Sequence, residues 1–347
     1  MKTPRIAVAA ALIGALFVTT ALSACGKSDD AGGAQTKQLR YQGSVGAVTP
    51  PELAEDLGYL GDVKLKWIGN TISGPQDIQA ATTGDIDFGG AFNGAIVKLA
   101  AAKAPIKAVI GYYGADKDSY IGFYVLNDSP IKTAKDLIGK KIGVNTLGAH
   151  SEAITKTYLT RAGLTSDEIK QVELVVVPPV NTEQSLRQGQ IDVASLGGTL
   201  RDKALARGGI RPLYTDFGLL GPFTAGSYVF RNDFIKKNPD TVRTFVTGVA
   251  KAIEWSRTTP RETVIARFQA ILTKRARNED NTQLQFWKSY GVNGKGGVIQ
   301  ESEFGTWVDW LSNAGELNGK DVKATDVYTN EFNPFATSGA AASGAAQ

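Results

Sequence analysis

One short pattern occurs twice in this chain, and it constrains the fold more than any other feature. The segment Gly84-Asp-Ile-Asp-Phe-Gly-Gly90 is echoed by Gly189-Gln-Ile-Asp-Val-Ala-Ser195. In each copy a glycine ends a helix-like stretch, an Ile-Asp pair opens an apolar strand, and small residues close it. Tyr124-Val-Leu-Asn-Asp128 and Tyr228-Val-Phe-Arg-Asn-Asp233 form a second pair of echoes. Two repeats in compatible order predict two lobes of similar build.

Strand-like and helix-like segments alternate from Gln38 onward, which is typical of an α/β fold with largely parallel sheets. Pro50-Pro51 opens a helix that Gly58 closes, and Ser73 begins a capping pattern for a helix that ends at Gly84. After Asn232 the pattern predicts helices throughout, beginning at Pro239, Pro260, Asp280 and Gln300. The first of these carries an apolar stripe that belongs in a core: Val242, Phe245, Val246, Val249 and Ile253.

The repeated Tyr-Val segments are interpreted as the two strands that cross between the lobes. This interpretation defines the domain organisation of a two-lobed α/β clamp with a helical C-terminal extension. The predicted parts are a signal peptide at 1–24, a flexible tether at 25–36, lobe one at 37–126 plus 230–335, lobe two at 127–229, and a disordered tail at 336–347.

Cys25 is the only cysteine among 347 residues, and it follows an export signal. Lys2 and Arg5 precede an apolar run over 6–18, and Leu22-Ser-Ala-Cys25 resembles the lipobox of bacterial lipoproteins. We therefore expect lipid on Cys25 and a chain anchored outside the cytoplasmic membrane. The alternative is an ordinary secretory signal with an incidental cysteine. A single cysteine excludes an intramolecular disulfide and a cysteine metal cluster.

Charge gives no sign of a nucleic-acid partner. Without the signal peptide the chain has 36 basic residues, because Lys2 and Arg5 are lost from 38, against 34 acidic ones. The two signs are mixed along the chain rather than gathered into a basic patch. The one basic run, Thr273-Lys-Arg-Ala-Arg277, is interpreted as a solvated helix face.

Loops rich in Gly, Ser, Thr and Asn follow several predicted strands, and in open α/β sheets ligands bind at such places. Glycine allows close approach to the backbone, and a helix N-terminus favours an anion. The alternative is that the hydroxyl and amide side chains only cap helices. Nearby aromatic residues would form walls for a ring or apolar portion. The predicted ligand-binding residues are Gln42, Gly43, Ser44, Ser73, Gly74, Ala91, Phe92, Asn93, Tyr120, Thr146, Gly148, Ala149, His150, Gly197, Gly198 and Phe223.

His150 is the single histidine, and we interpret it as a hydrogen-bond donor to a ligand. A hydrolase that uses His150 with a neighbouring hydroxyl is the competing hypothesis, but no G-x-S-x-G elbow occurs in the chain. Asp85 and Asp87 are not interpreted as an acid/base pair, because Asp192 repeats only the second of them and recurrence favours a structural role. The residues predict no enzyme, no cofactor and no metal site.

The chain resembles the substrate-binding proteins of ABC importers for nitrate, sulfonate, taurine and pyrimidine thiamine precursors. The resemblance extends from about 37 to 275. It is carried by Pro51–Leu60, Gly84–Gly90, Asp128–Gly143, Gly148–Ser151, Gly189–Asp192 and Asn238–Val242. The chain lacks the clustered cysteines of the eukaryotic pyrimidine-synthase relatives, which argues against that enzymatic variant.

The resemblance implies a type 2 periplasmic-binding clamp that closes over one small ligand by a hinge motion. The loops at 73–74, 91–93, 148–150 and 197–198 would contact this ligand, which we expect to be a small organic anion such as a sulfonate or carboxylate. A membrane permease and its ATPase would be the partners of a monomeric chain. A ligand sensor for a membrane receptor remains an open alternative.

Overall fold

The structure is a computed structural model that describes residues 35–336. The predicted signal peptide, Cys25, the tether up to Ala34 and the tail from 337 onward lie outside the described residues. The last two tether residues contact helix α10 (Pro239–Thr258): the Gln35 side chain accepts hydrogen bonds from the backbone N–H groups of Asp240 and Thr241. In the described part, no helix is long and apolar enough to cross a membrane.

Three sheets organise the described chain. Parallel strands β1 (Gln38–Gly43) and β2 (Lys64–Asn70) form the first sheet. Strand β10 (Phe223–Arg231) pairs antiparallel with β3 (Phe88–Phe92) and β4 (Ile106–Ala115) in the second. The third has the order β7-β6-β8-β5-β9, built from β5 (Ile121–Leu126), β6 (Lys141–Val144), β7 (Glu173–Val176), β8 (Val193–Gly197) and β9 (Ile210–Thr215).

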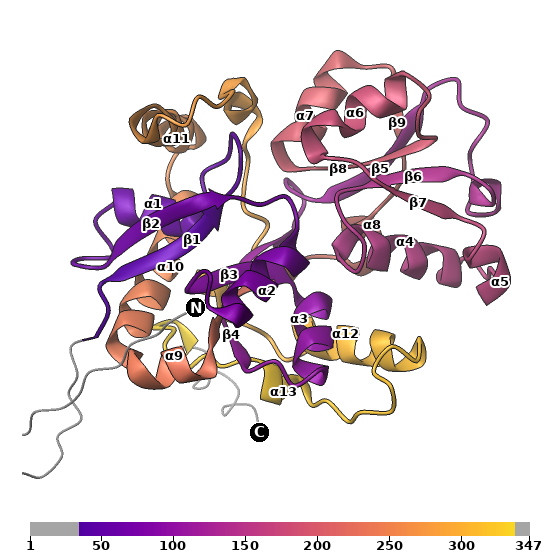
Figure 1. Ribbon diagram of the computed structural model, residues 1–347. Helices are drawn as coiled ribbons and strands as arrows, with labels where there is room; N and C mark the ends of the chain where they lie inside the picture. Colours follow the sequence, from indigo (N-terminus) through magenta and orange to yellow (C-terminus); the bar gives the residue numbers. More distant parts are fainter. Residues whose placement is uncertain (1–34, 337–347) are drawn as a thin grey trace, which may run out of the picture. The chain divides into compact units, whose positions relative to one another are not determined.

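Helices cover these sheets on both sides (Figure 1). Helices α6 (Pro179–Arg187) and α7 (Gly198–Arg207) lie on one face of the five-stranded sheet, and α4 (His150–Arg161), α5 (Ser166–Ile169) and α8 (Asp216–Leu220) lie on the other. The remaining helices are α1 (Pro50–Asp56), α2 (Gly74–Thr83), α3 (Asn93–Ala101), α9 (Asn232–Lys237), α10, α11 (Arg261–Arg275), α12 (Ser302–Asn313) and α13 (Ala324–Val327), with 3-10 turns η1 (Lys135–Leu137), η2 (Thr282–Phe286) and η3 (Lys295–Gly297).

The repeated Ile-Asp motif makes the same contact in both lobes. The Asp87 backbone N–H donates to the Arg40 carbonyl at 2.9 Å, and the Asp87 carboxylate accepts from the Arg40 N–H at 2.7 Å. Asp192 repeats both bonds with Lys141, each at 2.8 Å. Each aspartate therefore joins the loop before its own strand to the start of another strand. The structural role predicted for these aspartates is confirmed.

The apolar stripe of α10 is confirmed as core. Val242, Phe245, Val246 and Val249 are fully buried, and Ile253 is nearly so. They pack in one cluster with Leu53 and other apolar residues of α1, β4, β10 and α11. Because α10 packs against α1, it supports the loop that leads from β1 into α1.

Several expectations need correction. The sheets are mixed rather than largely parallel, because β5 and β10 pair antiparallel with both of their neighbours. No α-helix begins at Asp280, where the chain instead forms the short 3-10 turn η2. The chain changes sheet over 116–120 and 221–222, just before β5 and β10, and not within the two Tyr-Val strands. We therefore propose lobe boundaries at those two segments in place of 126/127 and 229/230.

Candidate ligand-binding site

Loops from the two lobes meet where the sequence predicts ligand contacts. Ser73 is the N-cap of α2, and its hydroxyl accepts from the Gln76 N–H and donates to the Thr146 hydroxyl at 3.3 Å. The Asn145 side-chain amide donates to the Ile72 carbonyl at 3.0 Å. Since Ser73 belongs to lobe one and Thr146 to lobe two, these bonds hold the two lobes together at their facing loops.

His150 lies at the centre of an aromatic enclosure beside these loops. It is the first residue of α4, and only 4% of it is exposed. Its ring stacks on Phe92 from lobe one, with centroids 5.2 Å apart, and Phe223 meets it edge-on at 5.7 Å. Tyr113 lies 5.9 Å from the imidazole, and Trp307 packs against Phe92 at 4.5 Å. Neither ring nitrogen of His150 has a hydrogen-bond partner.

Asp216 is the polar neighbour of His150 and was not predicted. One carboxylate oxygen accepts from the N–H groups of Ile121 and Phe217, whereas the other has no hydrogen-bond partner. This second oxygen lies 3.3 Å from His150 Nε2, without the geometry of a hydrogen bond. Burial raises the pKa of Asp216 to about 7 and lowers the pKa of His150 to about 3. The imidazole is therefore neutral at physiological pH.

Asp77 provides a second buried carboxyl, from lobe one. It lies in the first turn of α2, and one of its oxygens accepts from the Gly90 N–H at 2.7 Å. Its other oxygen has no partner, and burial raises the pKa of the carboxyl to about 7. An unpaired buried polar group costs about 1–3 kcal/mol. The site therefore contains several polar atoms that this closed arrangement leaves unsatisfied.

Close backbone packing explains the glycines around Asp77. A Cβ atom at Gly90 would lie 2.8 Å from the Tyr228 ring and 2.9 Å from the Tyr112 ring. A Cβ atom at Gly74 would lie 3.0 Å from the Ala91 Cα, so α2 begins directly against β3. These contacts hold the start of α2 and the end of β3 together, which places Asp77 next to the loop that carries Phe92.

The other predicted site residues differ in how well they are placed to contact a ligand. Gln42, the second-to-last residue of β1, has an unpartnered, buried side-chain oxygen. Ala149 and Gly197 are the N-caps of α4 and α7. Gly148 and Gly198 have φ near +71° and +51°, which only glycine adopts readily. Asn93 is different: it is fully buried, and its amide bonds to Thr224, Glu303 and Ser227 within the core. Asn93 therefore belongs to the core rather than to the proposed site.

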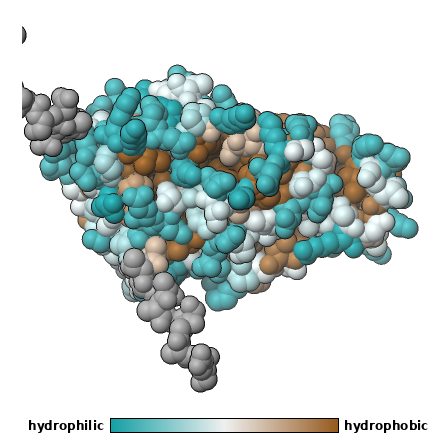
Figure 2. Space-filling view, turned by 90° about the horizontal axis from the view of Figure 1, so that it is seen from below, coloured by the Kyte–Doolittle hydropathy of each residue, from teal (hydrophilic) through white to brown (hydrophobic). Residues whose placement is uncertain are grey.

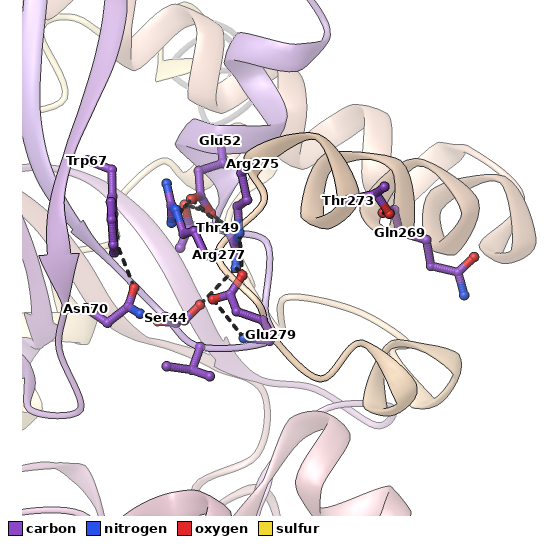
Figure 3. A network of polar contacts seen from close by, with 12 residues as sticks. Ser44, Thr49, Glu52, Trp67, Asn70, Gln269, Thr273, Arg275, Arg277 and Glu279 are labelled. Carbon is purple, nitrogen blue, oxygen red and sulfur yellow. Dashed lines mark hydrogen bonds and ion pairs between the residues drawn. The ribbon is translucent and has the colours of Figure 1, made fainter.

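The basic run at 273–277 is not a solvated helix face. Lys274 is exposed, but the Arg275 and Arg277 side chains are only 9% and 11% exposed, and both reach the Glu52 carboxylate, at 2.9 and 3.2 Å (Figure 3). Arg275 also donates to the Ser44 carbonyl. Arg277 stacks over Trp67 and lies within reach of Gly43, so two unpredicted arginines support a predicted ligand loop.

The segment that follows Arg275, residues 276–288, is here called the strap. On the lobe-one side, the Gly46 N–H donates to Glu279, and the Gln283 amide donates to the Gly46 carbonyl. On the lobe-two side, Asp280 lies 3.5 Å from Lys203, and Lys288 lies 3.1 Å from Asp202. Both lobe-two residues belong to α7, whose N-terminus is the predicted ligand loop at 197–198. The strap thus bridges ligand loops of both lobes.

Tyr120 lies in the first segment that connects the lobes. The Arg201 guanidinium stacks on its ring at 3.8 Å and donates to the carbonyls of Tyr120 and Asp118. Arg201 is almost completely buried and also pairs with Asp202. The position of Tyr120 is therefore determined by α7 of lobe two.

A cavity of about 10 Å³ lies between α3, α12 and the start of α4, and it is lined by Phe92, Gly148, Ala149 and Trp310 among others. Such a volume suits one water molecule. A separate cavity of about 330 Å³ has none of these lining residues and is walled by Asp116, Asp118, Arg257, Lys288 and Tyr290.

Large apolar side chains are exposed around the facing loops. Those in β2, at the end of β7, or in the segments that follow β1, β2, β6 and β7 are Val45, Trp67, Ile68, Ile72, Leu147, Val176 and Val180. Figure 2 shows that apolar and polar residues are also interspersed on one whole face of the molecule. Among residues 35–336, no group of three or more His, Cys, Asp and Glu side chains is arranged to hold a metal ion.

Two α/β lobes, joined by two crossings and lined by unpartnered polar groups where they meet, define the two-lobed clamp of type 2 periplasmic-binding proteins. The chain belongs to the NMT1/THI5-like family, whose family model matches residues 49–263, more than half of the chain. The family resemblance and the fold expected from the sequence are thereby confirmed.

Individual relatives agree with this assignment. A candidate binding protein of Brucella abortus (strain 2308) is 26% identical over 197 residues, which cover 55% of this chain and 57% of that protein. The chain thus matches just over half of the length of such curated relatives. The periplasmic aliphatic sulphonate-binding protein SsuA of Escherichia coli is 21% identical with a TM-score of 0.61, over 84% of this chain and 92% of its own. The periplasmic nitrate-binding protein NrtA of Synechocystis PCC 6803 is 13% identical with a TM-score of 0.67, over 85% and 87%.

Proposed function

We propose that this chain is the solute-binding component of an ABC importer, and that it closes over one small organic solute without changing it chemically. The observation that carries the proposal is the set of buried polar atoms without partners, which come from both lobes: Gln42 and Asp77 from lobe one, His150 and Asp216 from lobe two. A ligand that hydrogen-bonds to such atoms removes the cost of burying them unpaired. A solute that contacts both sets favours the closed state.

The proposed solute has an acidic group, as a sulfonate or carboxylate does. Helices α4 and α7 begin at the facing loops, and neither has a side chain that caps its first N–H groups. Free N–H groups at a helix start attract an anion. The arginines nearest to the loops, Arg201 and Arg277, are engaged with Asp202 and Glu52. Backbone groups would therefore bind the acidic group.

The cellular setting in the proposal follows from Cys25 and from the family. The chain would be lipidated at Cys25, anchored on the outer side of the cytoplasmic membrane, and monomeric. Its partners would be a permease and an ATPase in that membrane. The exposed apolar side chains of both lobes, Ile72 and Leu147 among them, support contact with another protein, because they flank the loops that close over the solute.

The hydrolase hypothesis has less support from the geometry. The Ser151 hydroxyl bonds to the Ser195 hydroxyl at 2.8 Å, and His150 has no hydrogen bond to any hydroxyl. Replacing His150 with Ala separates the two hypotheses. A binding protein should lose affinity for its solute and have no turnover to lose, whereas a hydrolase should lose its turnover.

A thermal-shift screen of the mature chain against sulfonates, nitrate, carboxylates, aromatic acids and pyrimidines tests the proposal. A solute at about 100 times its dissociation constant should stabilise the fold by roughly 2.7 kcal/mol. We expect one chemical class to raise the melting temperature, with the solute recovered intact. Conversion of the solute to a product would contradict the proposal.

A further inference from the structure

The unpartnered buried atoms of the site are mostly hydrogen-bond acceptors. Asp77 in lobe one and Asp216 in lobe two each have one carboxyl oxygen bonded to backbone N–H groups and one without a partner. The Gln42 side-chain oxygen is also buried without a partner. Each lobe therefore has a buried carboxyl oxygen without a hydrogen-bond donor. The other oxygen of the same carboxyl is bonded to the backbone and fixes its position.

The protein itself has no nearby cation available to these oxygens. The Arg201 guanidinium stacks on Tyr120 and bonds to Asp202 and to the carbonyls of Asp118 and Tyr120. Arg277 bonds to Glu52 and to the Tyr41 hydroxyl. His150 is beside Asp216 but does not hydrogen-bond to it. N–H donors on a solute would therefore satisfy both open oxygens.

A series of aromatic rings in contact links the surroundings of the two carboxyls. Tyr112 stacks on Tyr228 near Asp77, and Tyr112 packs against Tyr113, whose ring lies beside His150. Phe92 and Phe223 complete the enclosure around the imidazole. An array of rings thus runs from the surroundings of one carboxyl to those of the other, which suits a flat solute.

We propose that Asp77 and Asp216 are specificity-determining residues, and that they select a flat solute with N–H donors at two positions, one for each lobe. The inference rests on the proposed solute-binding function. An acidic group at the starts of α4 and α7 would complete the solute, but a bare acid would leave both carboxyl oxygens unsatisfied. Discrimination between solutes that differ only in N–H donors should therefore be large.

A series of three acids on one ring tests the proposal: benzoate, 3-aminobenzoate and 3,5-diaminobenzoate. Isothermal titration calorimetry on the full chain, purified from the cell envelope in detergent, measures each dissociation constant. We expect each amino group to strengthen binding about tenfold, because one net hydrogen bond has roughly that effect. Asp77→Asn and Asp216→Asn should each leave only one of the two steps, and the double variant should bind the three acids alike.

Asp62→Asn is the matched control, because Asp62 is an exposed carboxylate paired with Lys37 on the surface of lobe one. It should leave all three dissociation constants unchanged. Thermal unfolding without any acid checks that each variant folds. Equal affinity for the three acids in the unaltered chain would overturn the inference while leaving the binding function in place. Persistence of both steps in the Asp→Asn variants would overturn the roles of Asp77 and Asp216. Binding of none of the acids would contradict the aromatic, acidic solute and, with it, the inference.

Discussion

The least expected feature at the scale of single residues is a pair of buried carboxyls, one in each lobe. Burial gives Asp77 a pKa of about 7 in the folded chain, against 3.8 for an exposed aspartate. The folded chain therefore keeps a proton that the unfolded chain loses between about pH 4 and pH 7. The free energy of unfolding should fall as the pH rises through this window, because the folded state binds more protons.

Asp77→Asn should reduce this fall, because asparagine does not ionise. We expect the variant to be more stable than the unaltered chain at pH 8, by on the order of 1–4 kcal/mol, and to differ much less at pH 4. Urea unfolding at the two pH values measures the difference. A variant that loses stability equally at both pH values would show that Asp77 is ionised and satisfied in the folded chain.

Gly90 gives a second prediction at this scale, one of packing. A methyl group at this position would meet the Tyr112 and Tyr228 rings at less than 3.0 Å. Gly90→Ala should therefore destabilise the fold by about 1–3 kcal/mol. Gly305→Ala on α12 is the control, since its Cβ would meet nothing within 4 Å and should be neutral or stabilising. Similar unfolding midpoints for both variants would contradict the close packing at Gly90.

At the scale of elements, the strap (residues 276–288) links the loop after β1 to helix α7. Its ion pairs with lobe two, Lys203 with Asp280 and Lys288 with Asp202, join it to that lobe in this structure, and we expect them to break when the lobes separate. Replacing Lys203 and Lys288 together with Ala should weaken solute binding roughly two- to tenfold, mainly through faster release. Stopped-flow kinetics at low and high salt measure this, because salt should diminish the difference.

Lys170→Ala is the control for the strap, since Lys170 forms an exposed pair with Asp167 within lobe two. Its release rate should match that of the unaltered chain. An unchanged release rate in the double Lys variant would show that the strap has no part in closure.

Local signals in the sequence predicted the elements well, and contacts between distant residues account for what was missed. Ser73, Gly84 and the stripe of α10 carry information within one turn or one helix, and the Ile-Asp repeat makes the same bonds in both lobes. Arg275 and Glu52 lie 223 positions apart, and Asp216 meets His150 across another long separation. A periodic sequence pattern carries no information about contacts between residues so far apart. The burial of Arg275 and Arg277 and the contact of Asp216 with His150 were therefore not predicted.

The assignment of strands to sheets failed for a similar reason. The Tyr-Val segments look alike in sequence, yet β5 pairs with β8 and β9, whereas β10 pairs with β3 and β4. The alternation of apolar and polar residues within a strand indicates which residues are buried, but not which strand pairs with it. The expectation of mainly parallel sheets followed from the alternation of strands and helices along the chain. That alternation does not reveal that β5 and β10 run antiparallel to their neighbours.

At the scale of the whole molecule, the proposed anchor would place the clamp next to the proposed permease and ATPase. Cys25→Ala should move the chain from the membrane fraction to the soluble fraction of the envelope, because the lipid would be its only link to the bilayer. Fractionation followed by immunoblotting measures this. A chain that stays in the membrane fraction after the substitution would contradict lipid anchoring at Cys25.

The central claim is that the closed clamp holds one unaltered solute between its lobes. Native mass spectrometry of the chain, mixed with the tightest solute from the thermal-shift screen, tests this claim directly. We predict one solute per chain, recovered with its original mass after denaturation, and loss of the complex when Asp77 and Asp216 are both replaced with Asn. A product mass in place of the solute, or a complex that survives the double substitution undiminished, would contradict the account.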